Sequence, residues 1–227
     1  MSKNAELLGN LTGLFDAERK VREMQDALAA APKDALLDVL APAIAEAAKL
    51  DDELEASLRL VRIAGVLAEV EGPRAMDALI DILASDLPEA RHAAGEAIEE
   101  AAFERFKEVA QGVERALKRL PAGSPALPEL PYILAEVPEP GVLKLIEMFL
   151  RHADADAVAA AIEVSADIGD PALVKHLEKL KNDKRTVDMA EEDTEEPSEV
   201  TLGELAAEAI GLLTGDGDED EGGEEAR

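Results

Sequence analysis

The hydrophobic positions of the chain recur with helical spacing, and one helical pattern occurs twice. Residues 77–90 read DALIDILASDLPEA and residues 34–47 read DALLDVLAPAIAEA, with eight of fourteen positions identical and three more aliphatic in both. Within each copy the leucines return every three to four residues, which is typical of a helix that buries one face. We expect the equivalent leucines of both copies to be buried between neighbouring helices: Leu36 and Leu40, Leu79 and Leu83.

Proline and glycine divide residues 32–185 into further amphipathic segments of this kind. The intervals between Pro42, Pro73, Pro140 and Pro171 are 31, 67 and 31 residues. Because proline is tolerated in the first turn of a helix and disrupts its interior, we expect these prolines to mark helix starts. Repetition on this scale is typical of a helical solenoid, in which each helix pair buries the face of the next. The pattern therefore predicts an all-α fold, an α-solenoid of helix pairs.

Two segments carry more specific patterns. Residues 161–180 (AIEVSADIGDPALVKHLEKL) place a small-residue helix before Gly-Asp-Pro and an amphipathic helix, and residues 89–98 (EARHAAGEAI) contain Arg-x-x-Ala-x-x-Ala. These patterns resemble HEAT repeats, in particular the HEAT-like repeats of phycobilin-lyase-related proteins. The resemblance extends over residues 32–180 and implies about four or five HEAT-like helix pairs. It leaves the helix boundaries within residues 103–137 open.

The two ends of the chain differ from the repeats. Residues 1–31 carry two helical patterns, 4–15 and 16–31, and are expected to form an N-terminal helical cap. Residues 186–227 are expected to be an acidic disordered linker and tail. Within that extension, Thr201 and Glu204 match a capping box, which predicts a short amphipathic helix near 201–214. Whether this helix docks on the solenoid or on a partner is left open.

Composition and charge narrow the classes of function. The chain contains no Cys, which excludes disulfides and thiolate ligands. The formal net charge is −28, and residues 188–227 hold sixteen acids and one base. Because such a surface repels phosphate groups, we expect no direct nucleic-acid binding. No window of eighteen apolar residues is present, so we expect no membrane insertion and a cytoplasmic location.

Candidate chemistry is sparse. The three histidines fall within no catalytic constellation, and no His-Glu step of the kind used by HEAT-like di-iron enzymes is present. The acidic run from Asp216 has Glu221 where an EF-hand loop needs Gly. We therefore expect no catalytic residue, metal site or cofactor, and no enzymatic activity.

The expected function is a non-enzymatic protein–protein interaction scaffold or adaptor that binds another protein of unknown identity. Two groups of residues are candidates for partner binding: a positive ladder of Arg59, Arg62, Arg91 and His92, and the apolar stripe of Leu202, Leu205, Ala209 and Leu213. Two alternatives stay open. One is an acidic chaperone or nucleic-acid mimic that binds basic proteins, and the other is a lyase-like enzyme-associated module.

Overall fold

The computed structural model describes residues 3–189 and 198–215 of the chain. This part of the chain is mostly α-helical, with ten α-helices that pack largely in sequence order. It divides into two compact units, residues 1–97 and residues 98–227. No helix among the described residues is long and apolar enough to cross a membrane.

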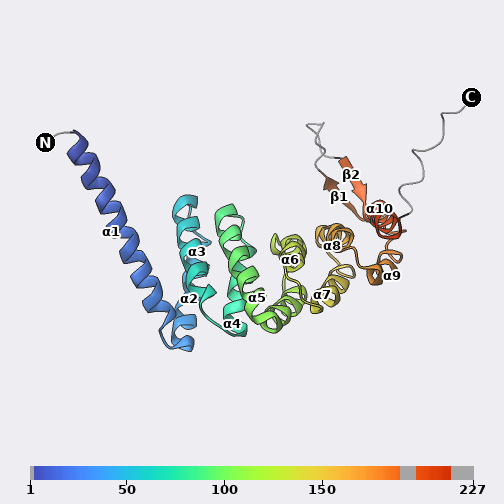
Figure 1. The fold of residues 1–227 in the computed structure, drawn as a ribbon, viewed down its shortest axis with the longest axis horizontal. Helices are drawn as coiled ribbons and strands as arrows, with labels where there is room; N and C mark the ends of the chain where they lie inside the picture. The colour runs from blue at the N-terminus through green and yellow to red at the C-terminus, as the bar shows by residue number, and fades with distance from the viewer. Residues whose placement is uncertain (1–2, 190–197, 216–227) are drawn as a thin grey trace, which may run out of the picture. The chain divides into compact units, whose positions relative to one another are not determined.

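The first unit contains α1 (Lys3–Ala29), α2 (Lys33–Ala47), α3 (Glu53–Ala68), α4 (Pro73–Leu83) and the start of α5 (Pro88–Arg119). Figure 1 labels these helices. Local signals fix the helix starts. The Asp52 carboxylate caps α3 by accepting hydrogen bonds from two backbone amides. Gly72 takes a positive φ of 109° and delivers Pro73 to the first turn of α4.

The core of this unit confirms the duplicated pattern. Both pairs of leucines are at most 6% exposed: Leu36 and Leu40, Leu79 and Leu83. They lie in α2 and α4, which contact each other and α3. The repeated sequence therefore supplies the buried faces of neighbouring helices.

The N-terminal residues form one helix where two were expected. α1 runs for 27 residues without a break. Asp16, which is a plausible cap for a second helix, instead accepts a 3.0 Å hydrogen bond from Arg19 one turn later in the same helix. A carboxylate satisfied in this way does not interrupt the helix.

The prolines are less regular markers than the sequence predicted. Pro73 begins α4, but Pro42 lies inside α2. Pro42 has no N–H to donate to the carbonyl group four residues earlier in the helix. Because Pro42 is exposed, water can solvate that carbonyl group instead. The boundaries left open in 103–137 are now defined: α5 ends at Arg119 after a break at Arg105 (φ −139°, ψ 45°), and α6 spans Ala126–Ala135 with Pro131 inside it.

The second unit contains the rest of α5 and α6, followed by α7 (Gly141–Phe149), α8 (Ala155–Ile168), the 3₁₀ turn η1 (Pro171–Leu173), α9 (Val174–Leu177), β1 (Thr186–Met189), β2 (Ser198–Thr201) and α10 (Leu202–Thr214). α8 is central to this unit because it contacts α6, α7, α10 and β1. Figure 1 shows α6, α8 and α10 following one another along the unit.

The two strands correct the expectation of a purely α-helical fold with a disordered linker from residue 186. β1 and β2 pair antiparallel, with Val187 opposite Val200 and Thr186 opposite Thr201. β-Branched side chains favour extended backbone, and Val187 is buried. The remaining parts of the expected linker and tail, 190–197 and 216–227, lie outside the described residues.

Candidate protein-binding surfaces

The C-terminal helix α10 docks on its own chain. The Thr201 hydroxyl accepts from the amide of Glu204, and the Glu204 carboxylate accepts from the amide of Thr201, which completes the predicted capping box. The Thr201 hydroxyl also donates to the Glu204 carboxylate at 2.6 Å, and this hydrogen bond, together with the one from the Thr201 amide, lowers the pKa of Glu204. α10 packs against α8 and α9.

The buried face of α10 is turned slightly from the predicted stripe. Leu202 and Ala209 are buried, whereas Leu205 and Leu213 are half-buried. Three further residues complete the buried face: Ala206, which shares the predicted apolar face, and Gly203 and Ile210, which were not predicted there. Two of the four predicted apolar positions therefore lie in the intramolecular contact.

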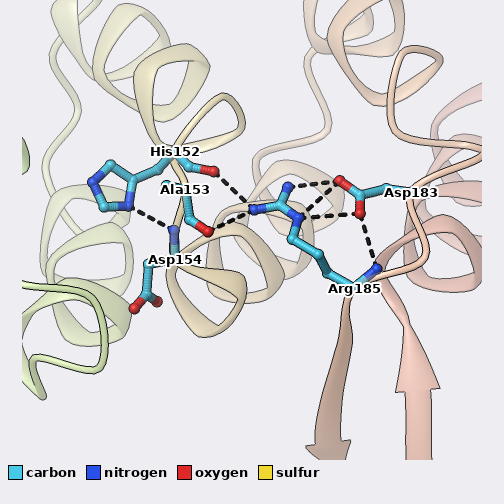
Figure 2. Close-up of polar contacts among 5 residues, drawn as sticks. All are labelled: His152, Ala153, Asp154, Asp183 and Arg185. Carbon is cyan, nitrogen blue, oxygen red and sulfur yellow. Dashed lines mark hydrogen bonds and ion pairs between the residues drawn. The ribbon is translucent and has the colours of Figure 1, made fainter.

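An arginine clamp holds the segment that leads into the hairpin and α10. Figure 2 shows the Arg185 guanidinium between two groups of acceptors. Its Nη1 donates to the carbonyl oxygens of His152 and Ala153, each at 2.9 Å. Its Nε and Nη2 donate to the Asp183 carboxylate, the shorter contact being 2.6 Å. These hydrogen bonds lower the pKa of Asp183 although burial opposes the shift.

The clamp continues into α10 through the backbone. The Leu202 amide donates to the Arg185 carbonyl at 2.9 Å, and the Gly203 amide donates to the Asp183 carbonyl at 3.0 Å. A Cβ atom at Gly203 would lie 2.8 Å from the carbonyl oxygen of Lys181. Glycine is therefore required where α10 begins, because the backbone there lies directly against another backbone segment.

A groove lies beside the docked helix, within the second unit. α8 forms its floor, Pro128 and Tyr132 of α6 lie on one side, and β1 and α10 lie on the other. Its volume is about 440 Å³. Among the described residues that line it, five are carboxylates and none is Lys, Arg or His: Asp156, Glu163, Asp167, Asp188 and Glu208. We call this feature the acidic groove.

Tyr132 joins one wall of the acidic groove to its floor. Its hydroxyl donates to the Glu163 carboxylate at 2.6 Å. Partial burial of the ring, together with this hydrogen bond, raises the pKa of Tyr132. The phenol therefore stays protonated and remains a donor near neutral pH.

A second surface lies on α1, in the first unit. α1 has no buried residue, and its large apolar side chains are 47–65% exposed at Leu7, Leu8, Leu11, Leu14 and Phe15. The same face continues toward the C-terminal end of α1, where Glu18 pairs with Arg62 of α3 at 3.5 Å and Gln25 lies over Gly65 of α3. We call the five apolar residues the α1 stripe.

The predicted positive ladder is neutralised at several positions. Arg59 pairs with Glu55 at 2.7 Å, and His92 lies 3.4 Å from Glu96, each one turn away on its own helix. Arg62 pairs with α1, as described above. Arg91 is half-buried on α5. The role of these four residues in partner binding stays a prediction.

The other two histidines hold structural contacts. His152 Nε2 lies 3.1 Å from the carbonyl oxygen of Leu117, and its Nδ1 accepts from the Asp154 amide. His176 is buried beside Arg151 and Glu147. Within residues 3–189 and 198–215, no three His, Cys, Asp or Glu side chains are grouped so that they could hold a metal ion.

Comparison with known proteins assigns no family to the chain. No family model matches the sequence, and no curated protein matches it. Among solved structures, the chain is similar to the crystal structure of an engineered protein, with 18% identity and a TM-score of 0.36 over 88% of this chain and 92% of the other.

Proposed function

We propose that the protein is a non-enzymatic interaction scaffold or adaptor built on HEAT-like helix pairs arranged as an α-solenoid. Consecutive helices that pack on one another in chain order support the repeat architecture. The duplicated leucines that fill the core of the first unit support it as well. A repeat scaffold offers extended surface for another protein and needs no reaction centre.

The α1 stripe is the observation that carries this proposal. Contiguous large apolar side chains on the surface of a soluble chain typically mark a protein–protein contact. Two exposed leucines of α3 extend the apolar surface, since Leu54 is 85% exposed and Leu58 is 57% exposed. They lie on the same face of α3 as Gly65, which α1 contacts through Gln25. Both helices thus leave apolar side chains uncovered near their contact.

Affinity purification from the native cell tests the proposal. The binding variant replaces Leu7, Leu11 and Leu14 with Gln, which keeps helix propensity and removes the apolar surface. The matched control replaces Glu6, Lys20 and Glu23 with Gln on the opposite face of α1. Because none of these side chains is buried, both variants should keep the helicity and unfolding free energy of the parent.

The expected result is that a protein retained by the parent chain and by the control is lost from the binding variant. Retention of the same proteins by all three chains would contradict the assignment of the α1 stripe as the partner surface. Amine-directed cross-linking of the complex, read at exposed lysines such as Lys3, Lys20 and Lys49, would then identify the surface that the partner uses.

A further inference from the structure

We propose that the acidic groove of the second unit binds an amphipathic helix of another protein, one that carries Lys or Arg on both sides of an apolar stripe. This site is independent of the α1 stripe because all of its lining residues belong to the second unit.

The shape of the floor suits a helix of about three turns. The groove follows α8 from Asp156 to Asp167, which corresponds to about 16 Å at the rise of an α-helix. Between these two acids, the floor presents the small side chains of Ala159 and Ala166. Small side chains allow the backbone of an occupant to approach closely, as in other helix-in-groove contacts.

The walls offer apolar contacts on both sides of that floor. Leu212 of α10 is 69% exposed and Tyr132 of α6 is 42% exposed, and both line the groove. Exposed aromatic and aliphatic side chains flanking a concave surface are typical anchors for a partner side chain. An occupant therefore needs an apolar stripe that can contact Leu212 and Tyr132.

Charge determines the rest of the occupant's chemistry. No described lining residue places a basic side chain among the five carboxylates of the groove to neutralise their field. The hydrogen bond from Tyr132 engages Glu163 without supplying a positive charge. A basic occupant gains attraction at both ends of the floor, whereas an acidic one is repelled. Steering of this kind is reduced by salt.

The same charge argues against an occupant from this chain. Residues 188–227 hold sixteen acids and one base. If the same residues of a second copy of the chain entered the groove, they would bring more negative charge to its carboxylates. The occupant is therefore assigned to a different, basic protein.

Fluorescence anisotropy with defined peptides tests this inference on the full-length chain. The probe is a labelled eighteen-residue Leu/Lys peptide with helical periodicity. A Leu/Glu peptide of the same pattern tests charge, and a Leu/Lys peptide of scrambled order tests amphipathicity. The groove variants are D156N/D167N/E208Q and Ala159→Trp, which respectively remove charge and fill the floor.

Each groove variant has a matched control outside the groove. E136Q/E139Q/E178Q removes three exposed acids elsewhere in the second unit. Ala207→Trp adds the same bulk to an exposed position on the far face of α10. Circular dichroism and unfolding of all four variants show whether each remains folded.

Specific binding of the periodic Leu/Lys peptide, weakened about tenfold or more by each groove variant and unchanged in the controls, is the expected result. Equal weakening by groove and control variants would overturn the site, because it would indicate only general attraction to an acidic protein. Binding of the Leu/Glu or scrambled peptide with similar affinity would overturn the assigned chemistry. A dimer of the parent chain that D156N/D167N/E208Q dissociates would assign the groove to a second copy instead.

Discussion

Gly203 shows how a single residue sets the position of α10. Its amide donates to the Asp183 carbonyl, and its missing side chain leaves room for the carbonyl oxygen of Lys181. These contacts require the start of α10 to face a segment about twenty residues earlier. The sequence marks the capping box at Thr201 but gives no sign of this backbone contact.

Replacing Gly203 with Ala should therefore change the free energy of unfolding in the opposite direction to replacing Gly211. Gly203→Ala should lower the free energy of unfolding by about 1–3 kcal/mol, because the new Cβ would meet backbone atoms that cannot rotate away. Gly211→Ala, also within α10, should raise it by about 0.5–1 kcal/mol, because its Cβ would meet nothing within 4 Å and alanine favours helix. Urea denaturation measures both. Equal effects would contradict the close backbone contact.

His176 makes the free energy of unfolding depend on pH. Burial lowers its pKa, and this effect outweighs the opposing charge of Glu147, while Arg151, Lys175 and Lys179 lower it further. The folded protein therefore keeps the imidazole neutral at a pH where the unfolded chain, with a pKa near 6.5, binds a proton. The contribution of neutral His176 to stability is therefore complete above about pH 6.5, and it is lost as the pH falls from there through the lower pKa of the folded state.

His176→Gln should accordingly reduce the loss of unfolding free energy between about pH 7 and pH 5. Denaturant unfolding at both pH values, in the parent and in the variant, measures the difference. His92→Gln changes an exposed imidazole and serves as the matched control. An unchanged pH dependence in His176→Gln would show that other groups account for it.

At the scale of elements, apolar periodicity was sufficient where a helix packs on its neighbours in sequence. The duplicated leucines and the helix near 201–214 were both predicted, and both are present. The hairpin was missed because short, polar strands such as Ser198–Thr201 carry almost no apolar alternation. The acidic groove was missed because its walls come from three separate segments, and their proximity depends on the docking of α10 against α8.

The repeated helices make a quantitative prediction. Leu79→Ala should cost about 2–5 kcal/mol of unfolding free energy, since this side chain is 1% exposed. Leu36→Ala, at the equivalent position of the first copy, should cost a similar amount. Leu54→Ala is the control, because Leu54 is 85% exposed and its truncation should cost less than about 0.5 kcal/mol. Losses below about 1 kcal/mol at both buried leucines would contradict their role in the core.

At the scale of the whole molecule, excess negative charge opposes folding. The formal net charge of −28 creates repulsion that the compact state feels more strongly than the extended chain. The interactions that counter it within the described part of the chain include the pairs Arg74–Asp38 and Arg185–Asp183, both at 2.6 Å. Self-repulsion should therefore appear in the salt dependence of stability.

The melting temperature should rise as NaCl is raised from about 10 mM to about 150 mM, because screening shortens the range of repulsion to about 8 Å. Deletion of residues 216–227 removes seven acids and one base, so it should reduce this rise. Differential scanning calorimetry of both chains measures the effect. A melting temperature that falls with salt would show that attractive pairs dominate instead.

The exposure of α1 over residues 3–20 has a consequence for how the chain unfolds. Since none of its side chains is buried, loss of the N-terminal turns uncovers little apolar surface that water does not already reach. Such an opening has a small heat-capacity change and a weak response to denaturant, and it can occur while α2, α3 and α4 stay folded. A protein that covers the α1 stripe would remove this partial opening. Measurements of partner binding and of the local ordering of α1 would then report the same coupled free energy.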